Sequence, residues 1–252
     1  MADEPFSECM LHAKSNKIDS AAAGLNVVEV SGDINGVDLA VFEREVLGPL
    51  QPKVAFFPVK AEAVAAINHL ESLGFEFAEL QLQLMHRLRP VPEAERYPYH
   101  FEEAQSEADR ARALELAGAI FAHDRFTTDP RFGRQVSGQR YQAYVHQSFQ
   151  APDERVFVMK NTKSQEVASF ATIRDLGSGN IRLLLGGVAN ELKNSGVGVI
   201  HDYVGLHAYY QLGYRHLSTA VSAINHPIIN LEIRHLGFRV TGSRLVLRKW
   251  YA

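Results

Sequence analysis

The most constraining feature of this sequence is the regular alternation of strand-like and helix-like segments over residues 156–250. Short or alternating apolar runs bounded by turn residues predict strands, and apolar residues recurring every three or four positions predict helices. The segments read strand, strand, strand, helix, strand, helix, strand: Val156–Met159, Glu166–Arg174, Ile181–Val188, Gly196–Tyr210, His216–Ala223, Pro227–Leu236 and Phe238–Trp250. This order predicts an α/β architecture in which helices cover a sheet.

A shorter set of similar patterns precedes this region. Three segments read as strands and two as helices: Leu25–Val30, Val54–Val59 and Phe75–Met85, then Val37–Leu47 and Ala61–Leu73. The prolines of Arg89-Pro-Val-Pro92 and Tyr97-Pro98 form a stiff connector. We therefore predict a smaller N-terminal α/β domain over residues 1–90 and a larger domain over residues 91–252. The larger domain begins with a predicted helix, Glu102–Phe121, which is rich in helix-forming residues.

Composition and charge exclude several classes of function. The formal net charge is -3, so the strong basic field typical of nucleic-acid binding is absent. No apolar run is long enough to span a membrane, and the acidic N-terminal residues do not resemble a signal peptide, so a cytoplasmic location is expected. Cys9 is the single cysteine and has no histidine signature around it. The 11 histidines show no metal-ligand spacing on a helix, so no metal is expected.

The segment Lys193–Gly198 joins a predicted strand to a predicted helix and carries the chemistry. Gly196 and Gly198 allow the backbone to approach a ligand closely, and the first amides of a helix have no partner within the helix. These amides and the helix dipole form an anion site, to which Lys193 adds a positive charge. The spacing matches neither the Walker loop nor the dinucleotide fingerprint. A plain structural turn would use the two glycines as readily.

Two segments, one in each predicted domain, are similar in sequence. Ile67-Asn-His-Leu-Glu-Ser-Leu-Gly-Phe75 precedes one alternating strand, and Ile229-Asn-Leu-Glu-Ile-Arg-His-Leu-Gly-Phe238 precedes another. Independent helix–glycine–strand junctions are common, and they are one explanation. The other is that the N-terminal block repeats part of the C-terminal fold.

The spacing Lys193-x-x-Gly196-x-Gly198 resembles the Gln/Arg-x-x-Gly-x-Gly/Ala motif of the GNAT acetyltransferase superfamily. In that family a strand with a bulge precedes the loop and offers backbone groups to the acyl-pantetheine, and Gly186–Ala189 occupy the matching place. A helix, a strand, an asparagine motif and Leu-Gly-Phe follow in the family, as Asn225 and Leu236-Gly237-Phe238 do here. The resemblance implies a mixed, mostly antiparallel sheet flanked by helices. It also implies that acetyl-CoA, or another acyl-CoA, is held by these residues: Gly187, Val188, Ala189, Lys193, Asn194, Ser195, Gly196, Val197 and Gly198.

The layout of the whole chain is most similar to TDP-fucosamine acetyltransferases, which carry an N-terminal partial domain. The similar segments are Phe121-Ala-His-Asp-Arg125-Phe126 and the aromatic helix Tyr141–Phe149. This resemblance implies that the acceptor is a small-molecule amine, with a nucleotide-linked amino sugar as the favoured class, and that neither nucleic acid nor a membrane is a partner. Arg125, Phe126 and Tyr144 are the candidate acceptor residues. Core packing is the favoured interpretation of any single aromatic ring, and at least one ring is expected to line the cleft. Family members are often dimers, so a homodimer is one expected assembly.

One position departs from the family pattern. Many members have a tyrosine after the asparagine motif, whose hydroxyl protonates the departing CoA thiolate. Counting forward from Asn225 puts Glu232 in this place, whereas counting back from Leu-Gly-Phe puts Ile233 there. Asn225 and Glu232 are the candidate catalytic residues, and Glu232 needs a pKa raised by burial to act as an acid. Three alternatives stay open: protonation by water or another group, a reaction needing little acid, and acyl-CoA binding without catalysis.

Overall fold

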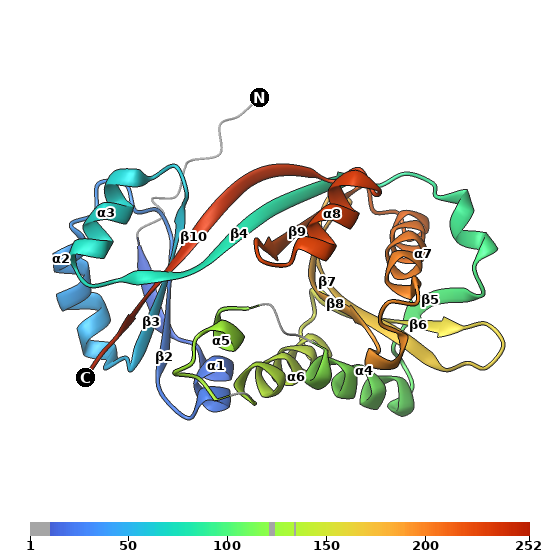
Figure 1. Ribbon diagram of the computed structural model, residues 1–252, viewed down its shortest axis with the longest axis horizontal. Helices are drawn as coiled ribbons and strands as arrows, with labels where there is room; N and C mark the ends of the chain where they lie inside the picture. Colours follow the sequence, from blue (N-terminus) through green and yellow to red (C-terminus); the bar gives the residue numbers. More distant parts are fainter. Residues whose placement is uncertain (1–10, 121–123, 134) are drawn as a thin grey trace. The chain divides into compact units, whose positions relative to one another are not determined.

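The computed structural model describes residues 11–120, 124–133 and 135–252 (Figure 1). Cys9 and the Phe121–His123 part of the acceptor motif lie outside these residues. The helices of four residues or more are α1 (Lys17–Ala23), α2 (Leu39–Phe42), η1 (Glu43–Leu47), α3 (Val64–Ser72), η3 (Pro92–Arg96), α4 (Glu107–Ala119), α5 (Arg125–Thr128), α6 (Val136–Ser148), α7 (Val197–Gln211) and α8 (His226–Arg234). The strands are β1 (His12–Ser15), β2 (Val27–Ser31), β3 (Val54–Lys60), β4 (Glu76–Arg87), β5 (Tyr99–Glu103), β6 (Glu154–Asn161), β7 (Val167–Gly177), β8 (Asn180–Val188), β9 (His216–Ser222) and β10 (Arg239–Trp250).

The chain divides into two compact units. The first ends at Gln81 and also includes Ser243–Ala252, and the second is Leu82–Gly242. The long strands β4 and β10 therefore contribute residues to both units, and the second half of β10 returns to the N-terminal unit. The predicted single boundary in the proline-rich connector did not include this contribution of Ser243–Ala252 to the N-terminal unit. None of the helices in the described part of the chain has the length and apolar character needed to cross a membrane.

The first unit is a small sheet with helices packed on it. β1 runs antiparallel to β2, β2 pairs in parallel with β3, and β3 is antiparallel to the second half of β10. β3 is nearly continuously apolar and is buried on both faces. Three rings join the helices to this strand, because Phe57 packs edge-on against both Phe42 and Phe75. The unit thus has a core of its own.

The second unit is a larger, mostly antiparallel sheet. From β5 the strand order is β5-β6-β7-β8-β9-β4. The pairs β5–β6, β6–β7 and β7–β8 are antiparallel, and β8 and β9 are parallel. This mixed sheet flanked by helices confirms the predicted fold class.

Helices cover both faces of this sheet, and strand β6 shows why. Val156 and Val158 pack into a cluster with α4, whereas Phe157 and Met159 pack into clusters that include residues of α7. Successive side chains of a strand point to opposite faces, so a strand buried on both faces reads as a continuous apolar run. In Figure 1, α4 and α6 lie together on one side of β6–β8 and α7 lies on the other.

The two units share an order of elements. In each, a strand and its parallel partner (β2 and β3, or β8 and β9) are followed by a nine-residue helix, the sequence Leu-Gly-Phe and a 12-residue strand. Gly74 and Gly237 both have a left-handed backbone, with φ of 86° and 76°, which glycine adopts most easily. This shared order is what an internal repeat requires.

Helices α4 and α6 cross where Gly138 of α6 lies against the backbone of Gly118 of α4. A Cβ atom on Gly138 would lie 2.5 Å from the backbone oxygen of Gly118. A backbone atom cannot move aside without shifting its helix, so we expect Gly138→Ala to lower the free energy of unfolding by about 1–3 kcal/mol. Urea unfolding checks this prediction. Gly242→Ala is the matched control, because nothing lies within 4 Å of that position, and equal losses in both variants would contradict the crossing as the cause.

Candidate functional site

Strands β8 and β9 pair briefly and then separate. Their parallel pairing covers only Asn180–Arg182 opposite His216–Ser218. Towards its other neighbour β7, the ladder of β8 skips Leu184, because Thr172 lies opposite Leu185 and Ile173 lies opposite Leu183. One extra residue of this kind is a β-bulge, which bends the strand. The bulge lies at Leu184, two residues before the segment Gly186–Ala189 that the sequence resemblance matched to the family's bulged strand. The separation leaves residues 183–188 of β8 without ladder partners on the β9 side.

The segment after β8 leads into the bare N-terminus of helix α7. A short 3-10 turn, η4 (Asn190–Leu192), comes first, and Gly196 then starts the helix with φ of 86°. The N-cap residue of α7, Gly196, has no side chain to cap the helix, and the Val197 amide makes only a long contact of 3.4 Å to the Ser195 hydroxyl. The space that a Cβ atom would occupy at Gly196 or Gly198 is open. Uncapped amides beside open space suit an anionic ligand, since the positive end of the helix dipole lies there.

The rest of the predicted loop is held in place locally. Asn194 has a left-handed backbone, with φ of 64°, and the Ser195 hydroxyl donates to the Leu192 carbonyl at 2.6 Å. Glu191 accepts from Arg112 of α4 at 2.5 Å, which ties the turn to the opposite layer of the unit. These contacts fix the loop around Lys193 and Val197 before any ligand is present.

The residues at the end of β8 have different surroundings. Gly187 packs closely against Ile120, because a Cβ atom there would lie 2.1 Å from the Cδ1 atom of Ile120 and the Ile120 side chain would have to shift. Val188 stays half-buried and lies opposite Ser169 in the ladder. The Ala189 amide donates to the Ala168 carbonyl at 2.9 Å and is thus already used by the sheet. Of the three residues, Val188 is the best placed to offer backbone groups to a ligand.

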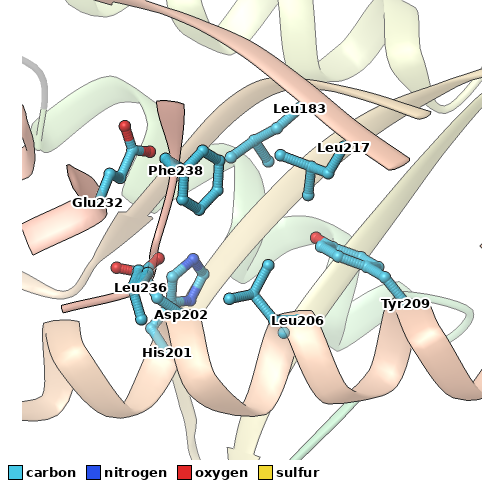
Figure 2. A pocket seen from close by; sticks show the side chains of 10 residues that line it. Leu183, His201, Asp202, Leu206, Tyr209, Leu217, Glu232, Leu236 and Phe238 are labelled. Carbon is cyan, nitrogen blue, oxygen red and sulfur yellow. The ribbon is translucent and has the colours of Figure 1, made fainter. Parts of the chain in front are cut away.

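A small cavity of about 20 Å³ lies between α7, α8 and the start of β9. Its walls are mainly leucine and aromatic side chains, with three polar exceptions: His201, Asp202 and Glu232. Figure 2 shows these three side chains towards one end of the cavity and Tyr209 towards the other. Ionisable groups in such a place are unusual, because burial without a partner is costly.

The cavity shows which of the two residues, Glu232 or Ile233, takes the position of the tyrosine that many family members have. Glu232 is 5% exposed and lines the cavity, whereas Ile233 is 36% exposed. One oxygen of Glu232, Oε2, is buried without a hydrogen-bond partner. Burial, together with the nearby charge of Asp202, raises the pKa of Glu232 to about 8. The carboxyl is therefore largely protonated at neutral pH, which is the condition that a general acid must meet.

Asn225 and His201 differ in their surroundings, and only His201 lines the cavity. Asn225 is half-buried and precedes α8, and its side chain makes no capping bond to that helix. His201 is buried in the first half of α7, where its Nδ1 atom lies 2.7 Å from the Ser169 hydroxyl. Burial lowers the pKa of His201 to about 4, so the ring is neutral.

The candidate acceptor residues gather around an arginine that sequence reasoning missed. The Arg140 guanidinium lies 4.2 Å from the centre of the Phe126 ring and 5.2 Å from that of Tyr144, and Arg125 lies 5.3 Å from the Phe126 ring. Asp124 caps α5 and accepts from the Ser137 hydroxyl at 2.6 Å. Phe126 is 1% exposed, and its ring packs against both arginines.

This cluster follows shortly after Ile120, a residue that contacts the end of β8. Ile120 packs against Gly187, and Asp124 follows four residues later. Four extended residues span at most about 14 Å, so the N-cap of α5 lies within about 14 Å of Ile120, the residue that contacts Gly187. In the described parts of the chain, no three histidine, cysteine or acidic side chains are grouped as metal ligands.

Comparison with solved structures identifies the fold. A GCN5-related N-acetyltransferase from Sphaerobacter thermophilus is similar with a TM-score of 0.67 and 14% sequence identity, over 96% of this chain and 76% of that one. The fold is that of the GCN5-related N-acetyltransferases (GNAT). A tandem GNAT protein from the clavulanic acid biosynthesis pathway is also similar, with a TM-score of 0.59 and 11% identity, over 89% of this chain and 75% of that one.

A third similar structure has a narrower description. It is a GCN5-related glucosamine N-acetyltransferase region of a fungal multi-domain β-N-acetylglucosaminidase, with a TM-score of 0.63 and 8% identity. The match covers 97% of this chain and 39% of that one. No protein-family model matches the sequence, and no curated protein matches it.

Proposed function

We propose that this protein is an acyl-CoA-dependent N-acyltransferase that uses acetyl-CoA to acetylate the amine of a small molecule. One observation carries the proposal: β8 and β9 separate after three residue pairs, and the chain passes from the end of β8 through the turn η4 to the N-terminus of α7, where Gly196 is the N-cap residue. The separation provides an extended slot for a pantetheine arm. The amides near Gly196 and Gly198, with Lys193 beside them, suit a pyrophosphate.

In the proposed acetyl transfer, each of these residues has a separate role. The neutral amine attacks the thioester carbonyl, and backbone amides near Val188 stabilise the negative charge that develops on its oxygen. The new C–N bond forms, the amine nitrogen gives up one proton to solvent, and the C–S bond breaks. Glu232 donates its proton to the leaving sulfur and later regains one from solvent. Asn225 steadies the pantetheine or an ordered water molecule, and no metal is needed.

For the acceptor we favour an amino sugar, including one linked to a nucleotide. Arg125, with Arg140 beside it, suits a phosphate group, and Tyr144 offers a half-buried ring for stacking. The similar fungal region described as a glucosamine N-acetyltransferase supports the same class of acceptor.

A second function has its own observation in its favour. The usual tyrosine is absent from α8, so the protein could instead be a GNAT-like acyl-CoA-binding or regulatory protein without turnover. Release of free CoA thiol separates the two functions. We expect release from acetyl-CoA to depend on one or more amines in a panel of amino sugars, nucleotide-linked amino sugars, polyamines and peptides. Saturable acetyl-CoA binding without release for any amine would favour the binding protein.

A further inference from the structure

The cavity beneath α8 holds one carboxylate that the reaction described above does not use. Asp202 of α7 lines the cavity together with Glu232 of α8. The volume of about 20 Å³ is enough for about one water molecule. Glu232 is 5% exposed and Asp202 is half-buried, so solvent screens the two carboxyl groups from each other less than it would at the surface.

The other groups that line the cavity provide no positive charge. The titratable groups that line the cavity are His201, Asp202 and Tyr209 from α7 and Glu232 from α8. The remaining elements, β8, β9 and the segment before β10, contribute only apolar side chains: Leu183, Leu217, Leu236 and Phe238. His201 is neutral and bound to Ser169. Among the described residues, Asp202 has neither an ion-pair nor a hydrogen-bond partner, so its charge acts on its neighbours without compensation.

The charge of Asp202 raises the pKa values of two neighbouring groups, Glu232 and Tyr209. Burial and then the charge of Asp202 raise the pKa of Glu232, and the same two causes act in the same order on Tyr209. Arg155 opposes this effect at Tyr209, but it does not act on Glu232. Burial raises the pKa of Asp202 itself to about 7. Two carboxyl groups in one small site lose their protons in separate steps, so the pair keeps one proton over the neutral range.

We propose that Asp202 is a positioning residue that keeps the shared proton on Glu232 and returns Glu232 to its protonated form after each turnover. When Glu232 gives its proton to the sulfur, two carboxylates are left facing one cavity. Their repulsion favours recapture of one proton from solvent, which restores the acid. This inference rests on the proposed acetyltransferase function, and it assigns to Asp202 a role that the tyrosine of other GNAT proteins does not require.

The decisive variant is Asp202→Asn, which removes the charge and keeps the shape. Loss of a like charge lowers the pKa of Glu232, so the protonated form is lost at lower pH. We expect the alkaline limb of the kcat profile to move down by about one pH unit, with the KM for acetyl-CoA unchanged. Asp202→Glu restores a carboxylate and should return the limb towards the wild-type position. Glu71→Gln, which removes an exposed charge in the other unit, should not move it.

A second measurement does not depend on activity. The carboxyl carbon of Glu232, labelled with 13C and assigned through the loss of its signal in Glu232→Gln, is titrated by NMR in the wild type and in Asp202→Asn. A midpoint that falls in the variant supports the proposal even if no amine is acetylated, in which case the proposed function fails separately. An unchanged midpoint, or a kcat that drops equally at every pH, would show that Asp202 is merely structural.

Discussion

Glu232→Gln lowers kcat by about 100-fold if Glu232 is the general acid, because an amide of nearly the same shape cannot give up a proton. We expect the KM for acetyl-CoA to change little, since the interaction is made in the transition state and not in the bound ground state. In the wild type, activity should fall as the pH rises through about 8, where Glu232 loses its proton. In Glu232→Gln this alkaline limb should disappear.

The neighbouring residue provides the matched control. Ile233 is the other position that sequence counting allowed for the missing tyrosine, and its side chain is exposed rather than directed into the cavity. Ile233→Ala should therefore keep full activity and the wild-type pH profile. Full activity in Glu232→Gln across the pH range would remove Glu232 from the reaction. It would leave water, or an uncatalysed departure of the thiolate, as the remaining alternatives.

Gly196→Asp should weaken acetyl-CoA binding by at least about tenfold, because it places a negative charge at the helix terminus where we expect the pyrophosphate. Gly196 has φ of 86°, a conformation that an aspartate or asparagine tolerates better than most residues. The open space around the position leaves room for the side chain. The main effect is thus electrostatic, and it should shrink as salt is added.

Gly196→Asn separates charge from shape. It carries the same backbone strain and nearly the same volume, so its affinity for acetyl-CoA should exceed that of Gly196→Asp by about tenfold. The comparison is made by calorimetric titration at low and high salt. Equal affinities in the two variants would place the pyrophosphate somewhere other than the α7 terminus.

Much of the fold could be predicted because its strong patterns are local. The order of β6 to β10, the glycine that starts α7 and the Leu-Gly-Phe junctions all follow from short apolar periods and from glycine positions. Strand β5 was missed because Glu102 and Glu103 are good helix formers, and the predicted helix began too early. Ser106 was the correct start signal, since its side chain accepts from the Asp109 amide.

The candidate site was harder to predict, because its decisive groups are brought together by tertiary packing. Helix α7 is apolar on almost every side, so no face could be assigned to Asp202 from the sequence. The one-residue ambiguity between Glu232 and Ile233 likewise needed the burial of each side chain to resolve it. Arg140 was missed because a single arginine in a helix has no sequence signal, although three aromatic rings surround it in space.

The most direct measurement of the central claim is hydrogen–deuterium exchange with and without acetyl-CoA. We predict slower exchange of the backbone amides at the end of β8 and in the first turn of α7, over residues 186–200, while the first unit exchanges as before. Two results would contradict an acyl-CoA site between β8 and α7. One is saturable binding with no protection in residues 186–200, and the other is no binding at about 1 mM acetyl-CoA, the upper end of ordinary Michaelis constants.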